Sequence, residues 1–371
     1  MMPKLNELLS DPCNTFVEKA IERGEIPVGY TCSYVPDVML MVKGLFPLRM
    51  RAPGVAGTEM ADSYLSSVIC SYCRSLLEFA MEGRYDFLKG WVFTASCDHL
   101  RRLYDNLAYL EERPFLHILD LPHKTSKAAL DWYEDELRKL AIELNRQFGV
   151  CVDEETLTEA VERRNRISFF LRKAGEERKK KDVFLKGSDF HRLMLLSRTV
   201  PADDFLPLIE KFLQDCKGGG EVHTGRARIL VAGGQLDDPA YLEVIESQGG
   251  LVVADRFCTG SLPGAGDIEL KEDPFRCVAK YYLEKMQCPR MMENFPFRLD
   301  EILKDIDDYH ADGVILQTVK FCDTWGVESS PLVSALRERG IPVLRLEREY
   351  RHSGEGQLKT RVQAFIESMG K

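Results

Sequence analysis

The chain has 371 residues, 44% of them hydrophobic and 29% charged, which is enough for about two or three globular domains. Its formal net charge of −9 argues against a nucleic-acid-binding protein, because such proteins normally present a basic surface. No apolar stretch reaches the roughly 18 residues of a membrane span, and residues 1–16 lack the regions of a signal peptide, so we expect a cytoplasmic protein.

The first part of the chain alternates between strand-like and helix-like patterns. Short runs of β-branched and aromatic residues predict strands, and apolar residues at helical spacing predict helices. The predicted strands cover residues 26–36, 45–51, 87–96 and 114–122, and the predicted helices cover 4–24, 36–44, 70–83 and 98–109. This alternation is typical of a parallel sheet with helices on both faces, so we expect an N-terminal α/β lobe over residues 1–123.

The middle of the chain, residues 124–216, contains long helical patterns and no predicted strand, so we expect a helical segment there. A basic cluster at 173–182 is interleaved with acidic residues. We expect it to be a solvated helix face, and a phosphate-contacting patch is the alternative. The glycine-rich stretch at 216–221 indicates a linker.

After this linker the alternation of strands and helices resumes. The predicted strands cover residues 227–234, 250–255, 313–319 and 341–347, and the predicted helices cover 238–249, 331–340 and 356–370. We therefore expect a C-terminal α/β lobe over residues 217–371. The predicted fold class is α/β, with two Rossmann- or flavodoxin-like lobes that carry parallel sheets and a helical segment between them.

Three of the eleven cysteines occupy positions that favour ligand binding. Cys97 and Cys322 each follow a predicted strand and precede an aspartate, and ligands of open α/β sheets collect beyond the carboxyl ends of the strands. Cys70 opens a predicted helix, where the N–H groups and the helix dipole favour a thiolate. Three thiolates at a shared cleft suit an iron–sulfur cluster with one iron left open, or a metal site with an open position.

The other cysteines and His99 leave alternatives open. Cys70 and Cys73 form a C-x-x-C motif, which also suits a redox dithiol, whereas a zinc ribbon would need a second such motif. Cys258, in a glycine-rich loop, and Cys288, before a proline, are weaker candidates to line the cleft. His99 is a candidate acid or base, with a helix-surface histidine as the alternative. The remaining cysteines are expected to be small hydrophobic residues: Cys13, Cys32, Cys151, Cys216 and Cys277.

No nucleotide-binding motif accompanies these residues. The sequence contains neither G-x-x-x-x-G-K-[ST] nor a strand-linked G-x-G-x-x-G, so we do not expect the chain to hydrolyse ATP itself.

Residues 68–106, 312–323 and 356–367 together resemble the 2-hydroxyacyl-CoA dehydratase family, which includes the small subunits of benzoyl-CoA reductase and the double-cubane cluster proteins. The resemblance covers nearly the whole chain. It implies that Cys70, Cys97 and Cys322 bind a [4Fe–4S] cluster, while Cys73 departs from the pattern of many relatives.

The resemblance also implies an activity and partners. We expect an oxygen-sensitive enzyme of anaerobic metabolism that acts on an acyl-CoA by radical dehydration or by reduction of an aromatic ring. Such proteins work as heterodimers of related iron–sulfur subunits and receive low-potential electrons from an ATP-dependent iron–sulfur activator. The alternatives are a standalone reductase with an [8Fe–9S] double-cubane cluster, which would recruit Cys73, Cys258 and Cys288, and an electron-relay or scaffold subunit without its own substrate site.

Two further residues are candidates for substrate contacts. Glu59 lies upstream of Cys70 and is a candidate for substrate or proton handling, with a first-turn helix acid as the alternative. Arg361, near the start of the last predicted helix, is a candidate contact for a CoA phosphate, with a structural cap as the alternative.

Overall fold

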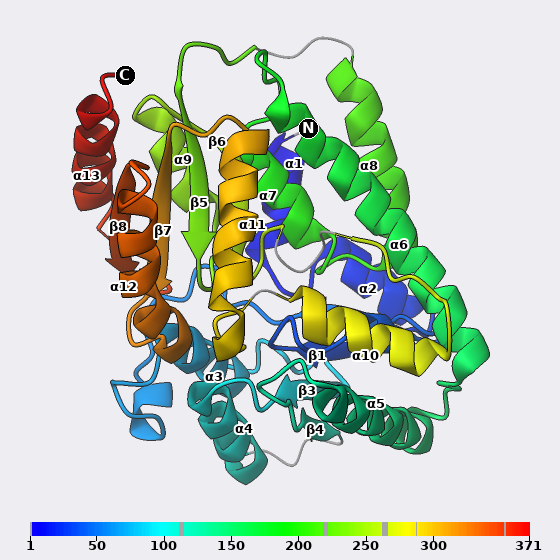
Figure 1. Ribbon diagram of the computed structural model, residues 1–371. Coiled ribbons are helices and arrows are strands. Elements are labelled where there is room, and N and C mark those ends of the chain that lie inside the picture. The colour runs from blue at the N-terminus through cyan, green and yellow to red at the C-terminus, as the bar shows by residue number, and fades with distance from the viewer. Residues whose placement is uncertain (1, 111–114, 218–221, 262–265, 287, 352–353) are drawn as a thin grey trace.

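The computed structural model describes residues 2–110, 115–217, 222–261, 266–286, 288–351 and 354–371. Its strands form two four-stranded parallel sheets. Figure 1 shows the first sheet below the second, with the long helices α6 and α8 running along one side of both. The predicted α/β class with two parallel sheets and long helices between them is confirmed.

The first sheet has the strand order β2-β1-β3-β4. Its strands are β1 (Ile26–Tyr30), β2 (Leu45–Arg49), β3 (Gly90–Thr94) and β4 (Leu116–Leu119). All four lie within the predicted strand segments. Every residue of β3 is buried, which fits a central strand covered on both faces.

The second sheet repeats this order as β6-β5-β7-β8. Its strands are β5 (Ala227–Gly233), β6 (Gly250–Phe257), β7 (Gly313–Val319) and β8 (Val343–Arg348). In both sheets the first strand in the chain lies between the second and the third, so the strand order reverses next to it. Such a reversal opens a crevice at the carboxyl ends of the strands, where ligands of α/β sheets bind.

Alternating side chains of β5 belong to two different cores. Ile229 and Val231 pack in the cluster that includes residues of α9 (Pro239–Ser247) and α13 (Glu355–Ser368). Leu230 and Ala232 pack on the other face, with residues of α11 (Phe295–Asp308) and α12 (Asp323–Arg337). Both faces of the sheet are therefore covered, as a parallel sheet requires.

The helices of the first lobe differ from the prediction at the N-terminus. The single helix predicted over residues 4–24 is two helices, and the short helix predicted over 36–44 is one turn of 3₁₀ helix. Asn14 separates the first two because its side chain accepts the N–H groups of Phe16 and Val17 and so starts a new helix. The elements are α1 (Met2–Ser10), α2 (Thr15–Glu22), η1 (Asp37–Leu40), α3 (Ser71–Met81) and α4 (Asp98–Leu110).

Long helices connect the two lobes, as predicted. They are α5 (Lys127–Phe148), α6 (Glu154–Glu176), α7 (Gly187–Leu196) and α8 (Ala202–Lys217). Ser126 caps the start of α5, and Gly149 ends it in the left-handed conformation. In the second lobe, α10 (Pro274–Lys285) and α11 were not predicted, and α10 packs against α5 and α6. The proposed domain boundaries at residues 123 and 216 stay a prediction.

Among the described residues, no helix is long and apolar enough to cross a membrane.

Candidate functional site

Three cysteines stand at the starts of three helices. Cys70 is the N-cap residue of α3, Cys322 is the N-cap residue of α12, and Cys97 directly precedes α4. Cys97 follows β3 and Cys322 follows β7, and each of these strands lies beside the reversal in its sheet. The two lobes therefore present their cysteines at the carboxyl edges where a ligand is expected.

The loop before Cys70 is held onto α3 by side chains of that helix. The Glu78 carboxylate accepts the N–H groups of Met60 at 3.4 Å and Ala61 at 2.8 Å. Arg74 donates to Asp62 at 2.9 Å from the same helix. These contacts position Cys70 although no strand leads into it.

The thiols of Cys70 and Cys73 are hydrogen bonded, with 3.6 Å between the two sulfurs. The hydrogen bond between the two thiols lowers the pKa of Cys70 below its usual value, although burial opposes this change. The same hydrogen bond, together with burial and the nearby charges of Cys70, Cys97 and Cys322, raises the pKa of Cys73. The two thiols therefore share one hydrogen bond and titrate as a pair.

Cys97 and Cys322 are close enough to Cys70 to be affected by its charge. Burial is the main cause that raises the pKa of both thiols, and the charge of Cys70 is the next. The backbone N–H groups of Leu100 and Trp325, three residues after each cysteine, oppose the rise. Thiols whose pKa values are raised by burial and by neighbouring thiolates lose part of this cost when they bind a cation.

The structure places His99 between the three cysteine loops. His99 lies two residues after Cys97, its Nδ1 accepts the backbone N–H of Cys70 at 3.0 Å, and its Nε2 lies 3.4 Å from Oδ2 of Asp323. Because Nδ1 is an acceptor, Nε2 carries the proton toward Asp323. His99 is 8% exposed, so the alternative of a helix-surface histidine is wrong.

The turn before Cys322 is strained. Phe321 has φ of 64° in the left-handed region, which glycine or asparagine normally occupies, and its ring is 42% exposed. Such outliers persist where the surrounding structure holds them and gather at functional sites.

Three other cysteines lie beside the candidate ligands. Cys32 follows β1, accepts a hydrogen bond from Ser96 at 3.3 Å, and contributes to the raised pKa of Cys97. Burial raises the pKa of Cys258 to about 12 and also raises the pKa of Cys288, with a further contribution from Cys32 in each case. From the sequence, Cys32 is expected to be a small hydrophobic residue. Its place directly after the first strand of an α/β lobe is the signal that identifies it.

Glu59 and Arg361 are not joined to the cysteines by any contact in the described part of the chain. Glu59 is exposed in the loop before η2 (Ala61–Ser63), outside any helix, and its carboxylate lies over Gly57. Arg361 donates to the carbonyl of Arg345 at 2.7 Å. It lines a cavity of about 280 Å³ that Lys320 and Arg348 also line.

No three histidine, cysteine, aspartate or glutamate side chains within the described ranges are placed to hold one metal ion. A [4Fe–4S] cluster makes a different demand, because each of its cysteine ligands binds a separate iron. The sulfurs therefore need not meet at one point. Three neighbouring cysteines at helix starts, each with a backbone N–H donor to its sulfur, fit this demand on the donor set.

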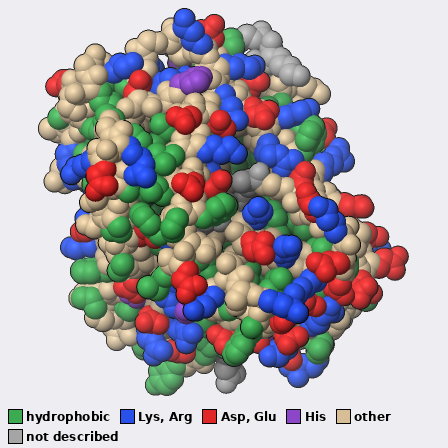
Figure 2. Space-filling view, viewed as in Figure 1, with side chains coloured by type: hydrophobic (Ala, Val, Ile, Leu, Met, Phe, Trp, Pro, Cys, Tyr) green, Lys and Arg blue, Asp and Glu red, His purple; other side chains and the backbone are tan. Residues whose placement is uncertain are grey.

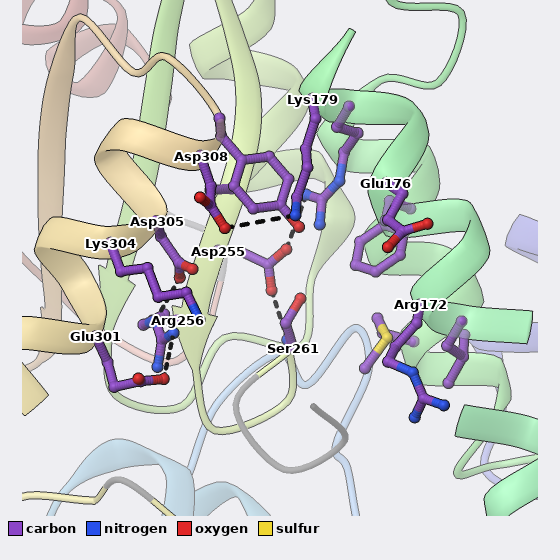
Figure 3. A pocket seen from close by; sticks show the side chains of 17 residues that line it. Arg172, Glu176, Lys179, Asp255, Arg256, Ser261, Glu301, Lys304, Asp305 and Asp308 are labelled. Carbon is purple, nitrogen blue, oxygen red and sulfur yellow. Dashed lines mark hydrogen bonds and ion pairs between the residues drawn. The ribbon is translucent and has the colours of Figure 1, made fainter. Parts of the chain in front are cut away.

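A separate cavity of about 260 Å³ lies between the helical segment and the second lobe. Figure 3 shows basic and acidic side chains from α6, β6 and α11 facing each other across it. A buried ion pair lines this cavity, with 2.8 Å between a guanidinium nitrogen of Arg178 and a carboxylate oxygen of Asp255. Arg178 belongs to the predicted basic cluster at 173–182, so the expected solvated face is wrong for this residue. The facing charges largely neutralise each other, and the cavity alone does not indicate a ligand.

The surface carries no continuous basic patch on the described part of the face in view. Figure 2 shows Lys and Arg interspersed with Asp and Glu over this face. This distribution gives no sign of a nucleic-acid interface.

Comparisons with known proteins identify the family of the chain. The sequence matches the family model of 2-hydroxyglutaryl-CoA dehydratase, D-component, over residues 32–369. A putative dehydratase subunit of Escherichia coli (strain K12) is 25% identical over 94% of this chain and 92% of its own length. The beta subunit of (R)-phenyllactyl-CoA dehydratase from Clostridium sporogenes is 20% identical over 98% of this chain and 97% of its own length. One of the subunits of benzoyl-CoA reductase from Thauera aromatica is 20% identical over 85% of this chain and 84% of its own length.

Proposed function

Because the chain belongs to the family of the 2-hydroxyglutaryl-CoA dehydratase D-component, we propose that it holds a [4Fe–4S] cluster on Cys70, Cys97 and Cys322 and acts on an acyl-CoA. It is a subunit of an enzyme of the 2-hydroxyacyl-CoA dehydratase or benzoyl-CoA reductase type. The reaction is the removal of the hydroxyl group of a 2-hydroxyacyl-CoA or the reduction of an aromatic acyl-CoA ring.

The meeting of three cysteines from two lobes at three helix N-termini carries this proposal. Cys70 is buried, Cys97 and Cys322 are partly buried, and Cys97 and Cys322 each follow a strand that ends at the carboxyl edge of its sheet. A cluster held there would supply one low-potential electron to the thioester. The chain contributes the thiolates, the N–H donors around them and the exclusion of water.

His99 acts in this proposal as a positioning residue. Both of its ring nitrogens face partners from other cysteine loops, so neither is free to exchange a proton with a substrate. Its role as an acid or base is the alternative. Glu59 remains the candidate for substrate or proton handling, and closure of its loop over the cleft would be needed to bring it to the substrate.

Basic residues near Cys322 support an acyl-CoA as the ligand. Lys320, two residues before Cys322, lines the same cavity as Arg348 and Arg361. Glu347 and Glu349 line it as well, and Lys320 lies 3.9 Å from Glu349, so three cationic and two anionic side chains meet there. Phosphate groups bind to cationic side chains near a helix start, and the cavity adjoins the start of α13. We therefore assign the CoA phosphates to this side of the site.

The partners follow from the relatives, several of which are beta subunits of dehydratases. We propose a related iron–sulfur subunit as the heterodimer partner and an ATP-dependent iron–sulfur activator as the electron donor. The second candidate function is a standalone reductase with an [8Fe–9S] double-cubane cluster. It is favoured by Cys258, Cys288 and Cys73, which lie near the three proposed ligands.

The test is anaerobic reconstitution of the full chain with iron and sulfide, followed by counts of both per chain. We expect about four irons, as for one [4Fe–4S] cluster, and a loss of iron in Cys97→Ser and Cys322→Ser. Cys277→Ser is the matched control, because Cys277 is also buried but lies on α10. About eight irons would favour the double-cubane reductase, and a folded chain without iron would contradict both proposals.

Absorption and paramagnetic resonance spectra after addition of acyl-CoAs then test substrate binding. A change in the cluster spectrum would identify this chain as the substrate-binding subunit. An unchanged spectrum together with no acyl-CoA binding would favour the relay or scaffold role.

A further inference from the structure

Cys73 is not needed for a three-cysteine cluster, yet its sulfur lies in contact with one of the proposed ligands. The Sγ atoms of Cys70 and Cys73 are 3.6 Å apart at the first turn of α3. No comparable contact between sulfurs joins Cys70 to Cys97 or Cys322 in the described structure. C-x-x-C pairs at a helix N-terminus form the redox-active dithiols of disulfide oxidoreductases. The position of this pair therefore also allows thiol redox chemistry at the site.

The two cysteines differ in access. Cys70 is 8% exposed and Cys73 is 1% exposed, so a small oxidant reaches Cys70 first. The sulfur of Cys73 contacts that of Cys70 and is therefore placed to react with it once it is oxidised.

We propose that Cys70 and Cys73 form a reversible disulfide when the chain lacks its cluster and meets a peroxide. The sulfur of Cys70 attacks the O–O bond of hydrogen peroxide, which gives a sulfenic acid and one water. The sulfur of Cys73 then attacks this sulfur and displaces its hydroxyl group as a second water. The two thiols lose two hydrogens and two electrons in total, and the peroxide is reduced to two waters.

The disulfide and the cluster exclude each other, and this step rests on the proposed function because Cys70 serves both. A sulfur that is bonded to Cys73 is no longer a thiolate ligand for iron. The pair would thus keep an empty site from irreversible oxidation to sulfinic acid, and a dithiol would return it to the form that binds iron.

The experiment treats the cluster-free full chain with hydrogen peroxide and maps its cysteines by peptide mass spectrometry. We expect a Cys70–Cys73 disulfide that dithiothreitol removes, with iron uptake lost after oxidation and regained after reduction. In Cys73→Ser we expect sulfinic acid at Cys70 and no recovery of iron uptake by dithiothreitol. Cys277→Ser should behave as the wild type.

The outcomes separate this proposal from the proposed function. A disulfide between Cys70 and another cysteine, or sulfinic acid at Cys70 in the wild type, would overturn the Cys70–Cys73 disulfide. An oxidised chain that takes up as much iron as the reduced one would overturn the exclusion. A reduced wild type that takes up no iron would instead overturn the proposed cluster, while the mapped disulfide would still support the redox pair.

Discussion

His99 is the side chain through which the three cysteine loops contact one another. It follows Cys97 by two residues and contacts the backbone of Cys70 and the carboxylate of Asp323. Asp98 and Asp323 each follow a candidate ligand, but only Asp323 is paired with His99 by its side chain in the described structure. The two Cys-Asp pairs therefore have different roles.

We predict that His99→Leu lowers the free energy of unfolding of the cluster-free chain by about 1–3 kcal/mol, because the buried N–H of Cys70 loses its acceptor. Urea unfolding monitored by tryptophan fluorescence measures this change. His99→Asn should recover part of the loss, because its amide oxygen can replace Nδ1 as the acceptor. Asp98→Asn is the control and should change the value by less than about 0.5 kcal/mol. A leucine variant as stable as the wild type would show that the contact contributes nothing.

The sequence located the candidate ligands but not the contacts between them. Cys97 and Cys322 are recognisable because each ends a run of strand residues, and Cys70 because it opens an amphipathic helix. Cys32 was missed because its strand was predicted to extend to residue 36, whereas β1 ends at Tyr30. The hydrogen bond of His99 depends on the distance between α3 and α4, which no local pattern encodes.

At the scale of elements, all eight strands lie at or near their predicted positions, whereas several helices differ. The inner strands β1, β3, β5 and β7 are short apolar runs that are almost wholly buried, and this pattern is local. The break between α1 and α2 depends on one asparagine cap within a continuous helical pattern. Helices α10 and α11 begin with prolines and carry many charged residues, and their apolar stripes are recognised only against the partners they cover.

Strands β5 and β7 approach each other closely at Gly233. Gly233 ends β5 with φ of 138°, and a Cβ atom there would lie 1.8 Å from the carbonyl oxygen of Gln317 on β7. We predict that Gly233→Ala lowers the free energy of unfolding by about 3 kcal/mol or more, since strain in the backbone adds to the steric overlap. Urea unfolding of the cluster-free chain measures it.

Gly326 provides the matched control for this substitution. It lies inside α12, and a Cβ atom there would meet nothing within 4 Å. Gly326→Ala should therefore stabilise the chain by roughly 0.5–1 kcal/mol through helix propensity. An equal effect of both substitutions would contradict the close approach of β5 and β7.

At the scale of the whole molecule, the cysteine site depends on how the two lobes are held together. One continuous core combines residues of the first sheet, the helical segment and α10. Direct contacts also join the lobes near the site, since the N–H of Tyr350 donates to Ser71 at 2.8 Å, next to Cys70. Contacts of this kind bring Cys322 near the other two cysteines only when both lobes are folded.

The packing of the helical segment on the second lobe buries His191, and this burial makes the stability depend on pH. His191, on α7, packs edge-on against Phe257 of β6 at 5.0 Å between ring centroids. Neither of its ring nitrogens has a hydrogen-bond partner among the described residues. Burial lowers the pKa of His191 from 6.5 to about 3, and the nearby Arg51, Arg198 and Arg192 lower it further while Asp255 opposes them.

Acid should therefore destabilise the chain through His191. Below pH 6.5 the unfolded chain binds a proton that the folded chain excludes until about pH 3, so the free energy of unfolding falls as the pH falls through this range. We predict that His191 accounts for about 2 kcal/mol of the loss between pH 7 and pH 5. Urea unfolding of the wild type and of His191→Leu at both values measures this share, because the other acid-sensitive groups are common to the two proteins. The two proteins should respond in parallel between pH 7.5 and 8.5, where histidine is neutral in both states. If the leucine variant lost as much stability as the wild type between pH 7 and pH 5, the folded chain would have to accommodate a protonated His191.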